Sequence, residues 1–240
     1  MKIALIGYGK MGKAIDELVT KKYARKHEIV LRVDSGNAGN FSSELQAADV
    51  AIEFTKPGAA IDNIYACFEA NVPVVVGTTG WYARKREVVE KCKSGSKGLF
   101  YASNFSVGVN VLFEINRQLA KIMAAHPEYR ASMEEIHHSS KKDAPSGTAI
   151  TFADDIVWAL PNVDEWVNDD SDRESELPII SKREGEVKGT HIIRYKSNID
   201  SIELKHEAHN RDGFSLGALM AAEFMQGKSG IYGMKDLLGI

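Results

Sequence analysis

The chain opens on a glycine-rich turn that narrows the folds available to it. Lys2–Ile6 is a short apolar run, and Gly7, Gly9 and Gly12 follow in the pattern G-x-G-x-x-G. Apolar residues after Gly12 recur at the spacing of one helix face. The order of strand, glycine turn and helix predicts a β-α unit whose helix start binds a pyrophosphate. The first glycine permits the turn, the second lets the phosphates approach, and the third lets helix and strand pack closely.

A carboxylate stands where such a unit recognises the ribose of a dinucleotide. Asp34 ends the apolar run Ile29–Val33, about 20 residues after the glycines. A carboxylate there accepts hydrogen bonds from a ribose hydroxyl and repels a 2′-phosphate. No arginine follows Asp34 directly, so the sequence predicts a nicotinamide dinucleotide site that prefers NADH. Lys10 and Arg32 are nearby cations that leave NADPH open as a second cofactor.

Apolar runs alternate with helical segments through the N-terminal part of the chain. The expected strands are Lys2–Ile6, Ile29–Val33, Val50–Phe54, Val72–Val76 and Leu99–Ala102. This alternation predicts a parallel α/β sheet. The loops Gly77–Gly80 and Ser103–Phe105 follow two of these strands, and ligands of open parallel sheets bind beyond the carboxyl ends of the strands. We therefore expect both loops to face the dinucleotide.

The pattern changes in the second half of the chain, which predicts a mixed α+β domain. The expected elements are a helix over Val109–Met123, a strand at Ala131–His137, a helix from the Ser-Gly-Thr turn to Leu160, an acidic surface loop at Pro161–Pro178, strands at Val187–Lys196 and Ser201–His209, and a helix at Phe214–Gln226. In the last of these strands, Ile202, Leu204, His206 and Ala208 alternate with charged or polar residues. That alternation predicts a sheet with one solvated face.

The densest chemistry lies in the stretch EEIHHSSKKDAPSGTAI, at Glu134–Ile150. His137 and His138 are adjacent, so on a strand their side chains would point to opposite faces. Lys141 follows closely and offers a cationic proton donor. Lys142 is equally compatible with an ordinary solvated surface charge. The segment predicts a pocket for a small, multiply charged anion on which acid–base chemistry is done.

A helix start completes this predicted pocket. Ser146 is a natural N-cap for the helix that follows. With Ser146 as the cap, the N–H groups of Gly147 and Thr148 would point out of the helix start toward a carboxylate. Glycine at position 147 leaves no side chain to block the approach.

The bulk properties of the chain exclude several other classes of protein. A net charge of −3 over 240 residues argues against a protein that binds nucleic acid or membrane surfaces. No apolar run reaches the ~20 residues that a membrane span needs. Cys67 and Cys92 have neither metal nor redox spacing, so we expect reduced thiols, no metal and a cytoplasmic protein.

The stretch EIHHSSKKDAPSGTA is similar to the signature of the 4-hydroxy-tetrahydrodipicolinate reductases, also called dihydrodipicolinate reductases. The likeness covers nearly the whole chain and extends to GYGKMG near the start, VGTTG at Val76–Gly80, SNFSVGVN at Ser103–Asn110, GEVKGTH at Gly185–His191, HNRDGF at His209–Phe214 and the tail GIYGMKDLL. It implies an enzyme that uses NAD(P)H to reduce 4-hydroxy-tetrahydrodipicolinate to tetrahydrodipicolinate, on the route to diaminopimelate and lysine. Hydride would go to ring C4 of a small dicarboxylate.

The resemblance also implies roles for individual residues. His137 and Lys141 would be the acid–base pair, and the substrate carboxylates would be held by His138, Lys141, Gly147 and Thr148. The residues that would bind the dinucleotide are Gly7, Tyr8, Gly9, Lys10, Met11, Gly12, Asp34, Gly77, Thr78, Thr79, Ala102, Ser103, Asn104 and Phe105. Many members have arginine and histidine at the positions of Ser139 and Ser140, so a less cationic pocket is expected here.

The same likeness implies the organisation of the molecule. It suggests a Rossmann-type dinucleotide-binding domain, residues 1–106 with 214–240, and an α+β domain for substrate binding and oligomerisation, residues 107–213. Members are typically homotetramers joined through the C-terminal domains, with a hinge between domains that closes on ligand binding.

Two other functions are compatible with parts of the pattern. An amino-acid or diaminopimelate dehydrogenase would share the dinucleotide site but would not require the histidine–lysine segment. A non-catalytic sensor of the NAD(H) ratio would keep Gly7–Asp34 and would have no use for Lys141 beside a helix start.

Overall fold

The computed structural model describes residues 1–39, 41–210 and 212–240. The chain packs as two compact units, Met1–Val107 with Asp212–Ile240, and Gly108–Arg211. Arg211, within the motif at His209–Phe214, lies outside the described residues.

In its described part, the first unit is built on a six-stranded sheet in the order β11-β5-β4-β3-β1-β2. The strands are β1 (Lys2–Ile6), β2 (Glu28–Val33), β3 (Val50–Glu53), β4 (Val74–Val76), β5 (Gly98–Tyr101) and β11 (Gly230–Tyr232). Each recorded pairing in this sheet is parallel, which confirms the predicted Rossmann-type fold. The strand order reverses between β1 and β3, and ligands of such sheets bind at that point.

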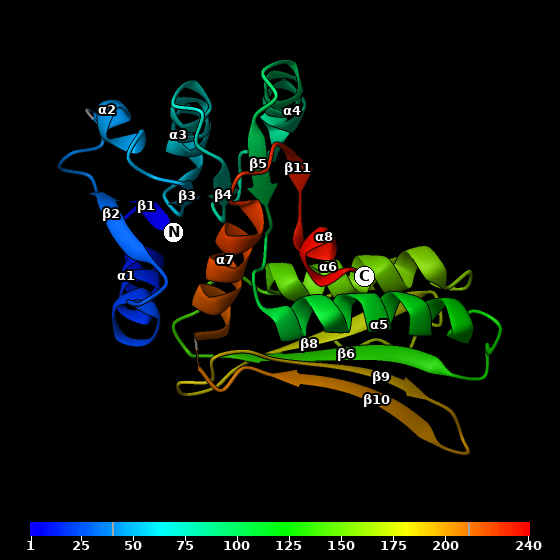
Figure 1. Cartoon of the computed structure of the whole chain (residues 1–240). Coiled ribbons are helices and arrows are strands. Elements are labelled where there is room, and N and C mark those ends of the chain that lie inside the picture. Colours follow the sequence, from blue (N-terminus) through cyan, green and yellow to red (C-terminus); the bar gives the residue numbers. More distant parts are fainter. Residues whose placement is uncertain (40, 211) are drawn as a thin grey trace. The chain divides into compact units, whose positions relative to one another are not determined.

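Helices cover both faces of this sheet (Figure 1). They are α1 (Lys10–Leu18), which continues into the π-turn η1 (Val19–Tyr23), α2 (Ser42–Leu45), α3 (Pro57–Glu69), the 3-10 turn η2 (Tyr82–Arg84), α4 (Lys85–Ser94), α7 (Asp212–Met225) and α8 (Met234–Leu238). Residues of α2, α3 and α4 pack on one face, and residues of α1, α7 and α8 pack on the other. Cys67 and Cys92 are free thiols buried in the first of these cores.

The first unit differs from expectation in several strand bounds: β3 ends at Glu53 rather than Phe54, and β5 spans Gly98–Tyr101 rather than Leu99–Ala102. The fourth strand begins at Val74 rather than Val72, because the N–H of Val72 donates to the carbonyl of Cys67 at 2.9 Å and so closes α3. The tail adds β11 beside β5, a strand that was not expected. Its three residues are too few to give a periodic signal, so strand pairing reveals what the sequence pattern does not.

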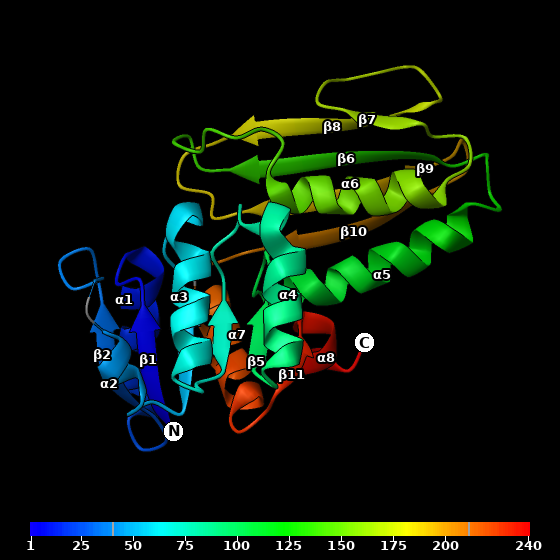
Figure 2. The ribbon, with the colours of Figure 1, turned by 90° about the horizontal axis from the view of Figure 1, so that it is seen from above.

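In its described part, the second unit is a mixed sheet with helices over one face (Figures 1 and 2). Its elements are α5 (Val107–Met123), β6 (Arg130–His137), α6 (Gly147–Ala159), β7 (Glu165–Val167), β8 (Glu176–Arg183), β9 (Thr190–Lys196) and β10 (Ser201–Glu207). The strand order is β10-β9-β6-β8-β7. β9 is antiparallel to both neighbours, whereas β8 is parallel to both of its own. This arrangement confirms the predicted α+β character.

The expected acidic loop at Pro161–Pro178 is wrong in part, because it contains β7 and the start of β8. The start of β8 was not predicted because it contains Pro178, and proline is normally excluded from central strands. In the structure Pro178 pairs with Val167, the last residue of the short strand β7. Leu177 and Ile179 on either side of it are completely buried in the core.

The alternation expected in the last strand also needs correction. The strand ends at Glu207, so Ala208 is not part of it. β10 is the edge strand, and its apolar positions are only half covered: Ile202 is 38% exposed and Leu204 is half-buried. The sequence pattern predicted one buried face and one solvent-exposed face, but no residue of β10 is fully buried on either face.

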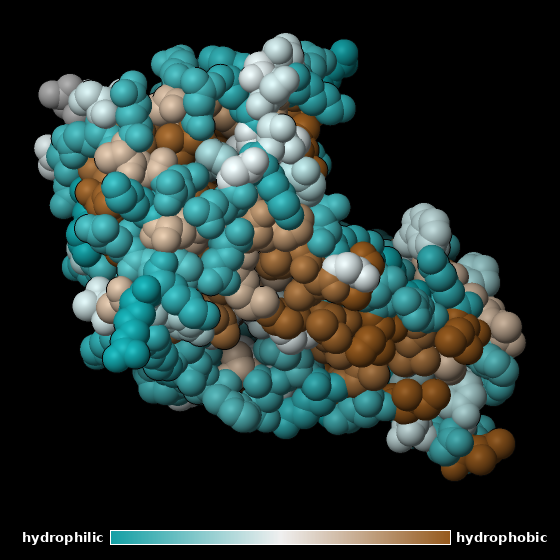
Figure 3. Space-filling model, in the orientation of Figure 1, coloured by the Kyte–Doolittle hydropathy of each residue, from teal (hydrophilic) through white to brown (hydrophobic). Residues whose placement is uncertain are grey.

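Helix α5 is apolar on its outer side as well as on the side that faces the core. Figure 3 shows an apolar area over this helix, where Val111, Ile115 and Ile122 are exposed. The Trp158 side chain of α6 is exposed as well, with the Lys121 ammonium 5.8 Å from the centre of its ring. Among the described residues, no helix has both the length and the apolar character needed to cross a bilayer.

The close approach of α7 to the end of β5 makes a prediction about stability. A Cβ at Gly217 would lie 1.8 Å from the carbonyl oxygen of Phe105. We therefore expect Gly217→Ala to lower the free energy of unfolding by about 1–3 kcal/mol, the usual cost of overpacking. The measurement is chemical denaturation followed by circular dichroism. Gly58→Ala is the matched control, because a Cβ there meets nothing within 4 Å. Equal midpoints for the two variants would contradict this reading.

Candidate active site

The glycine turn between β1 and α1 is held against the neighbouring strands. The N–H groups of Gly7 and Tyr8 both donate to the carbonyl of Val33 at 2.9 Å. Gly7 has a φ of +98°, and a Cβ on it would lie 2.1 Å from a carbonyl oxygen of the β3 loop. A Cβ on Gly12 would lie 2.2 Å from the carbonyl oxygen of Gly7, whereas one on Gly9 would meet nothing within 4 Å. The outer two glycines thus serve close packing, and Gly9 leaves the space that a pyrophosphate needs.

The other residues of this turn have distinct surroundings. The Tyr8 hydroxyl donates to Asp16 Oδ2 at 2.5 Å, and Arg32 donates to the same carboxylate at 2.6 and 2.9 Å. The hydrogen bonds from Arg32 lower the pKa of Asp16. Met11 is half-buried beside the core of this face, and Lys10 is exposed at the first position of α1. Because Arg32 is committed to Asp16, Lys10 is the better placed of the two cations for a phosphate.

Asp34 lies at the carboxyl end of β2, beside the glycine turn. Its Oδ1 accepts a hydrogen bond from the N–H of Gly36 at 2.7 Å, and its own N–H donates to Asn37 Oδ1 at 2.8 Å. These bonds fix the loop while the carboxylate stays exposed. The carboxylate and the glycine turn are joined through Val33, so the structure brings the two predicted parts of the dinucleotide site together.

The two later loops lie at the same edge of the sheet, because they follow the parallel strands β4 and β5. The expected ligand residues there differ in exposure: Thr79 and Ser103 are exposed, Gly77, Ala102 and Asn104 are half-buried, and Thr78 and Phe105 are buried. The Phe105 ring packs against Phe54 and Phe100, with centroids 5.6 and 5.9 Å away. The ring of Phe105 is therefore occupied by packing, and only its backbone is left for the predicted contact with a ligand.

A buried glutamate beneath these loops was not anticipated from the sequence. Glu53, the last residue of β3, is wholly buried, and burial raises its pKa. It accepts hydrogen bonds from the Thr55 hydroxyl and from Asn63 Nδ2, the latter at 3.3 Å. The N–H of Thr55 in turn donates to the Thr78 hydroxyl at 2.7 Å, which ties the β3 and β4 loops together. The one available signal was an acidic residue inside the apolar run Val50–Phe54.

In the second unit, β6 delivers the histidine pair as predicted. The burial pattern of β6 alternates, so His137 is buried on the face toward the helices. His138 follows the strand and is half-exposed, and its Nδ1 lies 2.8 Å from the Ser140 hydroxyl. Lys141 donates to both oxygens of the Asp143 carboxylate, at 2.8 and 2.7 Å. These bonds lower the pKa of Asp143 and hold the lysine ammonium in one place.

The start of α6 has the predicted cap. The Ser146 hydroxyl accepts a hydrogen bond from the N–H of Ala149 at 3.2 Å. A Cβ at Gly147 would meet nothing within 4 Å, so the space in front of the helix start is open. Thr148, the second expected N–H donor, is half-buried in the first turn. An open helix start with exposed N–H groups is suited to a carboxylate.

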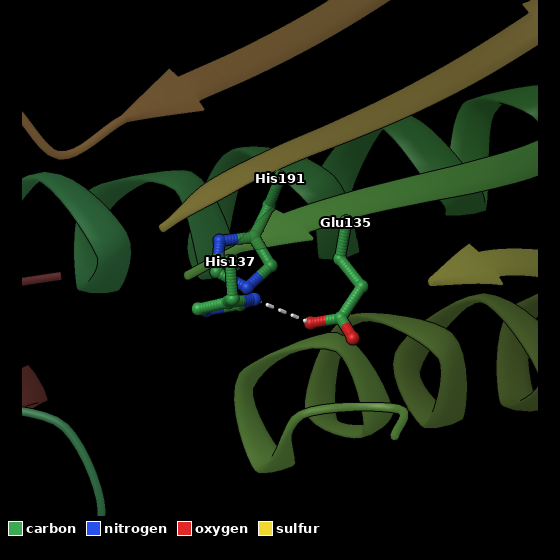
Figure 4. Close-up of side chains that lie close together, drawn as sticks. All are labelled: Glu135, His137 and His191. Carbon is green, nitrogen blue, oxygen red and sulfur yellow. Dashed lines mark ion pairs between the residues drawn. The ribbon is translucent and has the colours of Figure 1, made fainter. Parts of the chain in front are cut away.

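His137 belongs to a buried polar cluster with Glu135 and His191 (Figure 4). Glu135 Oε2 lies 2.9 Å from His137 Nδ1, and the rings of His137 and His191 are edge-on with centroids 5.2 Å apart. The donor atoms of the three side chains lie within 4.8 Å of one another, a spacing that one cation could bridge. Arg183 already neutralises the Glu135 carboxylate at 2.8 Å, so we interpret the cluster as a network for protons.

Glu135 and His191 were missed at the level of sequence. The only hints are the alternation that places Glu135 on the same strand face as His137, and the segment Gly185–His191 that ends in a histidine. Burial first, and then the neighbouring His137, lower the pKa of His191 to about 3. His191 therefore stays neutral at physiological pH.

Comparison with known proteins gives one consistent result. A family model described as dihydrodipicolinate reductase, N-terminus, matches residues 1–105, and the corresponding C-terminus model matches residues 108–238. A Christiangramia forsetii protein named 4-hydroxy-tetrahydrodipicolinate reductase is 47% identical over 241 residues, covering 99% of this chain and 98% of that protein. A Methanoregula boonei protein of the same name is 32% identical over 262 residues, covering 100% and 98%.

A solved structure shows that the fold is shared. Dipicolinate-bound dihydrodipicolinate reductase from Paenisporosarcina sp. TG-14 matches with a TM-score of 0.76 and 23% identity. The match covers 98% of both chains.

The three glycines of the β1–α1 turn make separable predictions. Gly9→Ala should leave the thermal midpoint unchanged, because its Cβ meets nothing in the protein. It should weaken NADH binding about tenfold or more, because the methyl group occupies the space for the pyrophosphate. Titration of NADH fluorescence measures the affinity. Gly12→Ala, whose Cβ would strike the carbonyl of Gly7, should instead lower the thermal midpoint. Unchanged NADH affinity in a folded Gly9→Ala variant would refute the assignment of Gly9.

Proposed function

This chain belongs to the dihydrodipicolinate reductase family, and from that premise we propose how its own residues carry out the reaction. It is an oxidoreductase that uses a pyridine nucleotide to reduce 4-hydroxy-tetrahydrodipicolinate in diaminopimelate and lysine biosynthesis. The observation that carries the proposal is the segment from β6 to α6. It presents a buried histidine, a fixed lysine and an open helix start within twelve positions, His137–Thr148.

The residues of the first unit fit a nicotinamide dinucleotide. Gly9 leaves an open cradle at the start of α1, and the exposed Asp34 stands where a ribose hydroxyl would be bound. The carboxylate repels a 2′-phosphate. Arg32, which would otherwise soften that repulsion, is bound to Asp16. NADH is therefore the preferred cofactor and NADPH the weaker one. When bound, the cofactor supplies the hydride that goes to ring C4 of the substrate.

The start of α6 and its neighbours bind the substrate, a cyclic imine with two carboxylates. The N–H groups of Gly147 and Thr148 receive one carboxylate, favoured by the positive end of the helix dipole. His138 and Lys141 contribute donors from the preceding loop. Dipicolinate, the ligand named for the Paenisporosarcina sp. TG-14 structure, is a ring with the same two carboxylates, which supports this class of ligand. Fixing both carboxylates also fixes which face of the ring is reduced.

Lys141 and His137 supply the proton that completes the reduction. The C4 hydroxyl first leaves as water, which gives the conjugated, dehydrated ring. Hydride addition at C4 of that ring pushes electron density toward the ring nitrogen, and the resulting enamine must be protonated. Lys141 carries a transferable proton on an ammonium whose position is set by the Asp143 carboxylate. His137 acts through Lys141 or in its place, as a buried ring next to a carboxylate.

Assembly and location follow the family expectation. We propose a homotetramer joined through the second unit, supported by the incompletely covered edge strand β10. The cytoplasmic location and a hinge that closes on ligands remain predictions. The dehydrogenase and sensor alternatives are less favoured, because both family models and the relatives compared are named as this reductase.

The first test of the proposal is a coupled assay. Pyruvate, aspartate semialdehyde and a dihydrodipicolinate synthase generate the unstable substrate in place, and absorbance loss is followed with NADH and NADPH separately. We expect oxidation only when all components are present, and a higher kcat/KM with NADH, because Asp34 opposes a 2′-phosphate. No oxidation with either cofactor, in folded protein that binds NADH, would refute the reductase activity. Faster turnover with NADPH would refute only the role of Asp34.

The lysine pair in the β6–α6 segment allows a matched test of the proton donor. Lys141→Ala should lower kcat by about 100-fold or more, the usual contribution of a positioned general acid. Lys142→Ala, which removes an exposed lysine next to it, should change kcat less than about twofold. Steady-state kinetics in the coupled assay measures both. A near-normal kcat for folded Lys141→Ala would exclude Lys141 as the donor.

A further inference from the structure

We infer that Glu135 is a positioning residue for the reaction: one buried carboxylate stabilises the positive charge of the proton-bearing His137 ring and at the same time fixes the start of α6. This inference rests on the roles proposed above for His137 and for the start of α6. It adds a residue that touches neither the substrate nor the cofactor and acts through two groups that do.

The contact with His137 comes from the geometry of β6. Glu135 and His137 are two positions apart on the strand, so both side chains point to the same face. Glu135 Oε2 lies 2.9 Å from His137 Nδ1 (Figure 4). The carboxylate is wholly buried and the ring is 9% exposed. At this distance, and away from water, the charge of the carboxylate acts directly on the ring.

The second carboxylate oxygen faces the helix that binds the substrate. Glu135 Oε1 accepts a hydrogen bond from the N–H of Ser146 at 3.2 Å. Ser146 is the residue whose hydroxyl caps α6. The cap hydroxyl also lies 3.3 Å from His191 Nε2. A single side chain thus links the proton donor to the position of the helix start.

The negative charge of the buried Glu135 carboxylate is compensated by a neighbouring cation. Arg183, at the end of the neighbouring strand β8, donates to Glu135 Oε1 at 2.8 Å. Burial by itself raises the pKa of Glu135, but hydrogen bonds from His137, Ser146 and Arg183 outweigh it and hold that pKa well below the usual range. Glu135 therefore carries its negative charge at any pH at which the reaction would be assayed.

The other charged or titratable groups around His137 come from four further elements. Arg183 lies level with it on β8, and His191 lies edge-on to it from β9. His206 of β10 pairs with His191, and burial lowers the pKa of both imidazoles. Lys141 lies on the following loop. These groups are neutral or positive, so the negative charge in contact with the His137 ring is that of Glu135.

If Glu135 served only the stability of the fold, Glu135→Gln would change stability and would not change the rate through His137. Glutamine has the shape of glutamate, and its amide oxygen accepts from Ser146 and Arg183 as the carboxylate does. The change removes the charge next to His137 and puts an NH2 group in place of the oxygen that faces its Nδ1. A loss of rate in Glu135→Gln without loss of fold therefore reports the loss of that carboxylate contact, provided that the effect disappears when His137 is also absent.

The test is a double-mutant cycle with Glu135→Gln, His137→Gln and the double variant, measured in the coupled assay. We expect Glu135→Gln to lower kcat by about 10- to 100-fold while KM changes less than about threefold. In the His137→Gln background the same change should alter kcat less than about twofold.

Additive losses of kcat in the double variant would overturn the inference. A normal kcat in His137→Gln would instead refute the proposed role of His137, and the two failures are thereby distinguished. Thermal midpoints are recorded for each variant. If Glu135→Gln does not fold because Arg183 is left uncompensated, Glu135→Gln with Arg183→Gln restores neutrality. The double substitution is compared with Arg183→Gln alone, and an equal kcat for the two would overturn the inference.

Discussion

The parallel pairing of β1 with β2 on one side and β3 on the other determines where each part of the proposed dinucleotide site lies. Parallel strands end at the same edge of a sheet, so the glycine turn and Asp34 meet there. The contact is enforced by hydrogen bonds from the turn to the carbonyl of Val33. It is enforced again by the close approach of Gly7 to the loop after β3, which no side chain would permit. The cofactor site is a consequence of strand order and backbone packing.

In the second unit the polar side chains of the proposed site are buried, so their charges must be compensated inside the protein. Glu135, His137 and His191 lie between the sheet and α6, where an unpaired charge would be costly. Arg183 supplies the opposite charge, and Ser146 supplies an N–H from the helix start. Glu135 Oε1 accepts from both of these groups, and Oε2 lies 2.9 Å from His137 Nδ1. These contacts connect the proposed proton donor to the start of α6, and connected buried polar groups rigidify a site.

Sequence reasoning predicted what depends on local pattern. The glycine motif, the Ser146 cap and the alternation at His137 are local, and the structure reproduces the elements that carry them. Sequence reasoning missed strands that form because of their pairing with neighbouring strands. These are the start of β8, which contains Pro178, and β11, which is only three residues long. Glu53 and Glu135 were missed for the same reason. Each is an acidic residue on a strand whose burial is set by neighbours distant in sequence, such as Asn63 and Arg183.

The two units therefore differ in how their charges act. In the first unit the proposed recognition charge, Asp34, is exposed and held by a local loop, so we expect its replacement to change cofactor binding with little consequence for the core. In the second, Glu135 is inaccessible and shared among a histidine, an arginine and a helix start, so its charge influences rate and helix position together. Solvent screens the first interaction and not the second. Salt should accordingly weaken discrimination between NADH and NADPH while leaving the support of His137 intact.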